Sequence, residues 1–255
     1  GEELAEWLVN KTFGDTVFFT NSGAEAVECA IKTARAYHQN AGDEGDASRF
    51  EIITFHNAFH GRTMATISAS NQTKMHHGFA PLLEGFKYAP FDDLEAAKAL
   101  IGPHTAGILV EPIQGEGGIR ATTTQFLKDL RAICDEFGLL LFYDEIHTGF
   151  GRTGKMWGYD WSGVKPDVRY STISSGDHVS LAGVMFGHAV TFGRDEVVVA
   201  FGRQIHQVTH IGGCETLIDE PHRLIPDELQ GVAILGDTVG NLGRPRHRRT
   251  MGGHQ

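Results

Sequence analysis

The sequence predicts an α/β fold built on a mostly parallel sheet with helices on both faces. Short runs rich in β-branched and aromatic residues alternate with longer runs whose apolar residues recur every three to four positions. The short runs are almost wholly apolar, as expected for strands that are buried on both faces. The 255 residues suffice for one large domain or two small ones.

The predicted elements follow one another in a regular order. Strands are expected at 16–20, 51–55, 105–113 and 139–143, and helices at 23–39, 92–101 and 122–138. Asp92 is placed to cap the second helix, and Gly138 is placed to end the third. Gly1 falls within an amphipathic helical pattern, which predicts that a further N-terminal portion precedes it.

Composition argues against several classes of protein. The formal net charge is −10, whereas general nucleic-acid binding needs a basic face that displaces counterions from phosphates. The longest apolar run, at 139–143, is far too short to cross a bilayer. Cys29, Cys134 and Cys214 are odd in number and lack CxxC spacing, so neither a disulfide framework nor a zinc knuckle is indicated. We expect a cytoplasmic protein with no nucleic-acid or membrane partner.

Four polar clusters follow predicted strands, at the edge where an open α/β sheet binds its ligands. They are TNSGAEA, HNAFHGRT, EPIQGEGG and DEIHTG. In the first, Ser22, Gly23 and Ala24 lead into a helix whose free amides could hold a phosphate. The same residues would serve equally well as an ordinary N-cap. In the last, Asp144 and Glu145 end a buried strand. Two carboxylates are unfavourable at such a position unless they have a chemical role.

The second cluster contains His56 and His60, whose spacing would suit a zinc ion if the segment were helical. Gly61 interrupts such a helix and no Glu follows His56 to act as a base, so we expect no metal site. The favoured interpretation is a loop in which Phe59 offers a flat stacking surface and Arg62 binds a carboxylate. A packed phenylalanine and a solvated arginine remain the alternative.

Three glycines, Gly149, Gly151 and Gly154, have the G-x-G-x-x-G spacing of dinucleotide-binding loops. The following KMWGYDWSG does not have the pattern of the helix that such a loop should open. Asp144 and Glu145 would also repel a pyrophosphate at that turn. A dinucleotide site is therefore disfavoured.

The motifs FFTNSGAEAVECAIKTAR, FHNAFHGRTMATIS, ILVEPIQGEGGI and LLLFYDEIHTGFGRTGKMWGYDWSGVKPD occur in this order. They resemble those of the class III aminotransferases, which use pyridoxal 5′-phosphate, and are most similar to the acetylornithine aminotransferase branch. The resemblance covers about residues 2–167. It implies the large domain of a fold type I transferase, here incomplete at both ends, and in the intact family member a second, smaller domain and a homodimer.

The resemblance also implies an activity. It is the transfer of an amino group from acetylornithine, or a similar ω-amino substrate, to a 2-oxo acid such as 2-oxoglutarate, of the arginine-biosynthesis type. Ornithine and 4-aminobutyrate enzymes share most of these motifs, so the amino donor stays open between them.

Cofactor-binding roles follow from the same resemblance. Asp144 matches the aspartate that pairs with the pyridine nitrogen and keeps it protonated, so that the ring can accept electrons. Gly23 and Ala24, with Ser22 beside them, match the phosphate-binding turn. Phe59 matches the aromatic residue that stacks on the ring. An ordinary cap at Asp144 is the alternative.

Substrate-binding roles follow likewise. Arg62 matches the arginine that binds the substrate carboxylate, and Glu116 matches a glutamate that gates it. His147 stands where the family usually has glutamine, beside the phenolic oxygen of the cofactor, and its titratable ring puts the tuning of the cofactor in question. Glu145 is expected only to support the turn.

One required residue is missing. The Schiff-base lysine of the family belongs about six residues after Asp167, where this chain has Ile173, and no lysine follows Lys165. No family motif is evident beyond Asp167, so we divide the chain into a partial cofactor-binding domain, 1–167, and an unrecognised segment, 168–255, with an arginine-rich end at 244–249. Residues 168–255 are interpreted as a misread, fused or disordered segment.

Two interpretations therefore remain. In one, the sequence is a truncated or misread record of a working transaminase. In the other, the chain is a catalytically inactive relative that binds pyridoxal phosphate noncovalently or acts only as a subunit.

Overall fold

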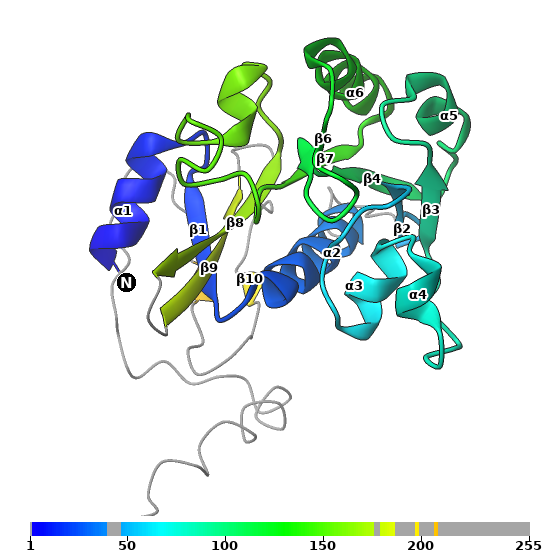
Figure 1. Ribbon diagram of the computed structural model, residues 1–255, viewed down its shortest axis with the longest axis horizontal. Helices are drawn as coiled ribbons and strands as arrows, with labels where there is room; N and C mark the ends of the chain where they lie inside the picture. Colours follow the sequence, from blue (N-terminus) through cyan, green and yellow to red (C-terminus); the bar gives the residue numbers. More distant parts are fainter. Residues whose placement is uncertain (1, 40–46, 176–178, 187–196, 199–206, 209–255) are drawn as a thin grey trace, which may run out of the picture.

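The computed structural model describes residues 2–39, 47–175, 179–186, 197–198 and 207–208 (Figure 1). Cys214 and the arginine-rich end at 244–249 lie outside these residues. Among the described helices, none combines the length and the apolar character needed to cross a membrane.

A seven-stranded sheet forms the centre of the described structure, with the strand order β1-β9-β8-β7-β4-β2-β3. Its strands are β1 (Thr16–Thr20), β2 (Glu51–Phe55), β3 (Phe86–Ala89), β4 (Thr105–Val110), β7 (Leu140–Asp144), β8 (Val168–Ser175) and β9 (Val179–Phe186). All neighbours from β8 to β3 are parallel, whereas β9 is antiparallel to both β8 and β1. The carboxyl ends of β1 and of the five parallel strands therefore lie at the same edge. The predicted α/β class with a mostly parallel sheet is confirmed.

Helices cover both faces of this sheet, as Figure 1 shows. They are α1 (Glu2–Lys11), α2 (Gly23–Gln39), α3 (Met64–Ala69), α4 (Thr73–His76), α5 (Leu94–Ala99), α6 (Thr124–Phe137) and the short 3-10 helix η1 (Gly158–Trp161). Two pairs of short strands complete the description: β5 (Ile113–Gln114) with β6 (Arg120–Ala121), and β10 (Val197–Val198) with β11 (Gln207–Val208).

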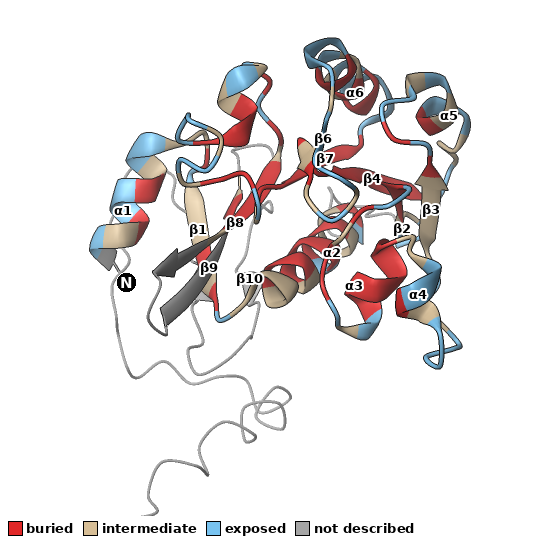
Figure 2. Ribbon diagram, viewed as in Figure 1, coloured by how far each residue is buried: buried red, intermediate tan, exposed pale blue. Residues whose placement is uncertain are grey.

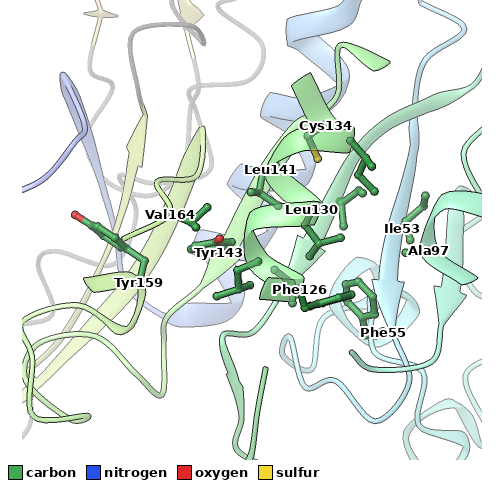
Figure 3. Packing of buried hydrophobic residues seen from close by; sticks show 14 of the residues in the cluster. Ile53, Phe55, Ala97, Phe126, Leu130, Cys134, Leu141, Tyr143, Tyr159 and Val164 are labelled. Atoms are coloured by element: carbon green, nitrogen blue, oxygen red, sulfur yellow. The ribbon is translucent and has the colours of Figure 1, made fainter. Parts of the chain in front are cut away.

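The sheet separates two hydrophobic cores, because successive side chains of a strand point to opposite faces. Ile53 and Leu141 belong to the core covered by α5 and α6 (Figure 3). Their sequence neighbours Ile52 and Leu140 belong to the core covered by α2 and α3. Figure 2 shows the strands at the centre of the sheet as buried along their length. This two-sided burial explains why the strands are apolar throughout.

Several element boundaries differ from those predicted. The strand expected at 105–113 ends at Val110, because Pro112 cannot donate a ladder hydrogen bond. The cap of α5 is Asp93 rather than Asp92: the Asp93 side chain accepts a hydrogen bond from the Ala96 amide at 3.0 Å. The Asp92 carboxylate instead accepts hydrogen bonds from Thr123, the residue that caps α6. Gly138 ends α6 in the left-handed conformation, as predicted.

The sheet continues beyond Asp167, where the motifs that carry the family resemblance end. β8 pairs with β7, with Asp144 opposite Tyr170, and β9 pairs with β8 along its whole length. These two strands from the segment 168–255 therefore share a sheet with the residues before them. The division of the chain into domains at 167–168 stays a prediction.

Candidate active site

β7 ends at Asp144, whose carboxylate is buried at the carboxyl edge of the sheet. Its Oδ2 lies 2.8 Å from Nδ1 of His60, and its Oδ1 accepts a hydrogen bond from the Ile146 amide at 3.1 Å. Asp144 is 3% exposed and His60 is 1% exposed. Because each carboxylate oxygen can accept two hydrogen bonds, Asp144 can still accept one from a further donor.

His60 is held from both its backbone and its ring. Its amide donates to Ser70 Oγ at 2.8 Å, while its buried Nε2 has no hydrogen-bond partner among the described residues. Burial lowers the pKa of His60, but the hydrogen bond and charge of Asp144, together with the charge of Glu111, outweigh burial and raise the pKa overall. The imidazolium form is therefore favoured beside Asp144.

Glu111 follows β4 and lies on the same edge. Its Oε2 accepts a hydrogen bond from the Phe59 amide at 3.1 Å, and the residue is 4% exposed. Burial raises the pKa of Glu111 to about 7, opposed by the charge of His60 and by hydrogen bonds from the Phe59 and Gly115 amides. From the sequence, His60 is considered only as a zinc ligand, and Glu111 has no assigned role. Their signal is a polar residue directly after a buried strand, which becomes informative only when the neighbouring strands are known.

Phe59 and His147 face one another across the site. Their ring centroids are 6.2 Å apart and their planes are inclined by 13°. The guanidinium of Arg62 lies 5.4 Å from the Phe59 ring centroid. Phe59 is half-buried, whereas Arg62 and His147 are exposed. The structure thus brings together an aromatic surface, a cation and an imidazole. All three belong to residues that the sequence motifs predict for the site.

The start of α2 provides both a cap and free amides. Ser22 caps the helix, since its Oγ accepts a hydrogen bond from the Glu25 amide at 3.3 Å. The amides of Gly23 and Ala24 have no acceptor within the helix, and the helix dipole favours an anion beside them. A Cβ atom on Gly23 would lie only 2.6 Å from Cδ1 of Ile146. The helix start therefore contacts the residue two positions after Asp144.

Glu116 lies exposed on the turn that joins β5 to β6. The hairpin is fixed over the site, because Gln114 Nε2 donates to the His56 carbonyl at 2.9 Å and a Cβ atom on Gly115 would lie 2.5 Å from His147 Nδ1. Within the described ranges, Glu116 forms no ion pair with Arg62. The two residues therefore lie at the rim without an ion pair between them.

The two histidines of the second motif have different partners. The His56 ring contacts the side-chain amide of Asn71, whereas the His60 ring contacts Asp144. Their separation by four residues therefore does not direct both rings at one point.

Glu145 supports the turn after β7. Its Oε1 accepts a hydrogen bond from the Tyr159 amide at 2.7 Å, and its Oε2 lies 3.7 Å from Nη1 of Arg169. The Gly149 amide donates to the Glu145 carbonyl at 2.8 Å. A Cβ atom on Gly149 would overlap the Ser171 hydroxyl. Close packing thus explains the first glycine of the G-x-G-x-x-G pattern.

A sequence model described as aminotransferase class III matches residues 1–214 of the chain. The chain belongs to the class III aminotransferase family. It is 46% identical to acetylornithine aminotransferase from Mesorhizobium japonicum over 245 residues, covering 92% of this chain and 60% of the relative. It is 48% identical to acetylornithine aminotransferase from Brucella melitensis over 252 residues, covering 94% and 61%. The chain thus spans about 60% of the length of these curated relatives.

Solved structures of aminotransferases share this fold. Ornithine aminotransferase from Toxoplasma gondii ME49 has a TM-score of 0.69 and 33% identity, covering 74% of this chain and 45% of that one. An ω-transaminase from Thermomicrobium roseum has a TM-score of 0.67 and 30% identity, with coverage of 74% and 47%. Class III aminotransferases depend on pyridoxal phosphate, and a second structure of the Toxoplasma enzyme describes pyridoxal phosphate at its active site.

The residues of this aminotransferase-family chain fit the noncovalent contacts of that cofactor. The buried Asp144 has capacity for one more donor, Phe59 offers a ring face, and α2 begins with two amides that have no acceptor within the helix. β8, with the sequence VRYSTISS, contains no lysine. Lys155 lies elsewhere, since its Nζ donates to the Asp160 carbonyl at 2.9 Å. Within the part of the chain that the structure describes, these groups fit the ring and the phosphate of the cofactor, and β8 supplies no amine for a covalent bond to it.

Proposed function

We propose that the protein represented by this chain transfers an amino group from acetylornithine, or a similar ω-amino substrate, to 2-oxoglutarate. The observation that carries this proposal is the buried Asp144–His60 pair on the same sheet edge as the start of α2. The identities of 46% and 48% with proteins named acetylornithine aminotransferase support the choice of donor. A cytoplasmic homodimer acting in arginine biosynthesis is part of the same proposal.

Three parts of the chain would bind the cofactor. When bound, pyridoxal phosphate supplies an electron sink for the charge that develops at the substrate carbon. Asp144 would hold a proton at the ring nitrogen, and His60 fixes the orientation of Asp144. Phe59 would cover one face of the ring. The amides of Gly23 and Ala24 would bind the phosphate.

The residues at the rim would bind the substrate. Arg62 offers a guanidinium fork for the substrate carboxylate, and its contact with the Phe59 ring would keep it beside the cofactor. Glu116 lies on the hairpin above the same region and would restrain a substrate-binding arginine when no carboxylate is present. His147 would donate a hydrogen bond to the phenolic oxygen in place of glutamine.

A second function rests on the absence of lysine from β8. As written, the chain would bind the cofactor through noncovalent contacts alone and would not turn over. In the family, a lysine amine binds the cofactor and transfers the proton at the substrate carbon, and no other described side chain has that place.

One substitution tests both functions. Ile173 is the sixth residue after Asp167 and lies within β8, so Ile173→Lys should restore the amine. Ser174→Lys is the matched control at the next position of the strand. Each chain is incubated with pyridoxal phosphate, reduced with borohydride, digested and searched for a labelled lysine peptide. Glutamate formed from acetylornithine and 2-oxoglutarate is measured in parallel.

We expect a stoichiometric label at position 173 and glutamate formation in Ile173→Lys alone. Label without turnover would support cofactor binding but not the proposed reaction in this chain. A label on Lys155 or Lys165 of the unaltered chain, together with glutamate formation, would show that the chain is active as written. Absence of any label in Ile173→Lys would contradict the placement of the missing amine.

A further inference from the structure

Glu111 is a buried acid that the roles described above leave unused. It lies within the same rim as Asp144 and His60, and each of the three residues is less than 5% exposed. Its side chain is fixed by the Phe59 amide, directly next to His60 in the chain. A buried carboxylate is costly unless another group requires its charge.

His60 is the group that requires this charge. Its ring contacts Asp144 through Nδ1, and within the described ranges its buried Nε2 has no hydrogen-bond partner. One carboxylate beside one imidazolium gives a neutral pair, so Asp144 alone would have its charge cancelled by His60. With Glu111 also ionised, the three groups carry one net negative charge.

We propose that ionised Glu111 is a positioning residue that keeps His60 cationic and thereby leaves one net negative charge at Asp144 for the ring nitrogen of the cofactor. The part that concerns the ring nitrogen rests on the proposed function. The part that concerns His60 is a property of the chain without cofactor. Glu111 acts through His60 and does not touch the ring itself.

Among the residues that the structure describes, the titratable groups that face Glu111 come from three parts of the fold. His60 lies in the loop after β2, Asp144 ends β7, and Tyr170 lies on β8 opposite Asp144. Burial and the charges of Asp144 and Glu111 raise the pKa of Tyr170 well above its usual value, so its hydroxyl stays neutral. With Tyr170 neutral, the charge of the cluster changes near neutral pH through Glu111, whose pKa lies at about 7.

The first experiment follows the charge of His60 in the cofactor-free chain. The ring ¹⁵N shifts of His60 are recorded from pH 5 to pH 9 and assigned by their loss in His60→Asn. They are compared with those of Glu111→Gln, which keeps an oxygen to accept the Phe59 amide but cannot ionise. Glu84→Gln, at an exposed loop position, is the control.

We expect Glu111→Gln to lower the pKa of His60 by about one unit or more, which corresponds to a tenfold change in its protonation equilibrium. The unaltered chain should also show a His60 shift change centred near pH 7, as Glu111 loses its proton. If His60 titrates identically in the unaltered chain and in Glu111→Gln, the inference is overturned. Should the variant fail to fold, the titration of the unaltered chain still tests the inference, because His60 shifts without a change near pH 7 would overturn it.

The second experiment measures the affinity for pyridoxamine 5′-phosphate, a probe that needs no lysine, by calorimetry at pH 6 and pH 8. At pH 6 Glu111 is largely protonated, so the unaltered chain and Glu111→Gln should bind alike. At pH 8 the unaltered chain should bind about tenfold more tightly. Comparison at equal pH removes the probe's own titration.

The two experiments separate the two proposals. If the unaltered chain and Glu111→Gln bind the probe equally at both pH values, the positioning role of Glu111 is overturned. The proposed cofactor site would not be contradicted by this result. No binding by any chain, together with a shifted His60 pKa in Glu111→Gln, would contradict the proposed function and still support the link between Glu111 and His60.

Discussion

The guanidinium of Arg169 lies over the indole ring of Trp157, with Cζ 3.4 Å from the ring centroid, and both side chains are fully buried. Nη1 of Arg169 is 3.7 Å from Oε2 of Glu145. Burial lowers the pKa of Arg169 to about 10, so the side chain remains cationic at neutral pH. One buried cation therefore joins β8 to the turn that begins at Asp144.

Removing the Arg169 charge should destabilise the chain by leaving Glu145 buried without its ionic partner. We expect Arg169→Met, which preserves much of the side-chain volume, to lower the free energy of unfolding by roughly 3–5 kcal/mol. The double variant Arg169→Met/Glu145→Gln should recover most of this loss. Urea denaturation of the three chains gives the comparison, and a double variant no more stable than the single one would show that the ion pair is not the cause.

Asp144 should be tested with asparagine rather than alanine, because its carboxylate also neutralises the buried His60. In the chain that carries Ile173→Lys, Asp144→Asn should abolish amino transfer, since an amide cannot hold the ring nitrogen in its protonated form. The fold should persist, with unchanged circular dichroism. Full activity in Asp144→Asn would contradict the proposal that Asp144 keeps the ring nitrogen protonated. Asp144→Ala should lose stability as well as activity.

Arg62 is exposed, and its guanidinium lies over the Phe59 ring. In the chain with Ile173→Lys, Arg62→Ala should raise the KM for acetylornithine by about tenfold or more while changing the affinity for pyridoxamine 5′-phosphate much less. Lys98→Ala, which removes an exposed cation from the Phe137 ring elsewhere, is the control. An unchanged KM in Arg62→Ala would show that Arg62 is a solvated surface residue that does not bind the substrate.

Glu111 should make stability depend on pH. Burial raises its pKa from 4.5 to about 7 in the folded chain, so between these values the folded state keeps a proton that the unfolded state has released. This contribution is complete below about pH 4.5 and is lost as the pH rises through about 7. Glu111→Gln should flatten the decline in unfolding free energy between pH 5 and pH 7, as measured by urea denaturation. In the unaltered chain His60, whose pKa is also raised from 6.5, should add a separate decline at higher pH.

A slope that is identical in Glu111→Gln and in the unaltered chain would contradict this assignment. Glu84→Gln provides the control, because Glu84 is exposed.

The sequence predicted the elements with strong local signals. Strands such as 16–20 and 51–55 and the helix 23–39 have the bounds that their apolar patterns indicate. Errors occur where tertiary contacts override local rules, as at Asp92, which turns toward Thr123 instead of capping α5. β8 contains the buried Arg169. A charged residue interrupts the apolar pattern by which a buried strand is predicted, so the sequence does not predict this strand.

For the site, the sequence by itself determined which residue types stand at the carboxyl ends of the strands: the acid at 144, the aromatic at 59 and the small residues at 23 and 24. It also determined that no lysine follows residue 165. Only the tertiary structure decided that His60 and Glu111 join Asp144, because the three residues lie at or beyond the ends of three different strands, and hydrogen-bond partners far apart in the chain have no shared sequence pattern. Burial of all three groups in one place then sets their charges, and burial is a property of the packed sheet rather than of any one segment.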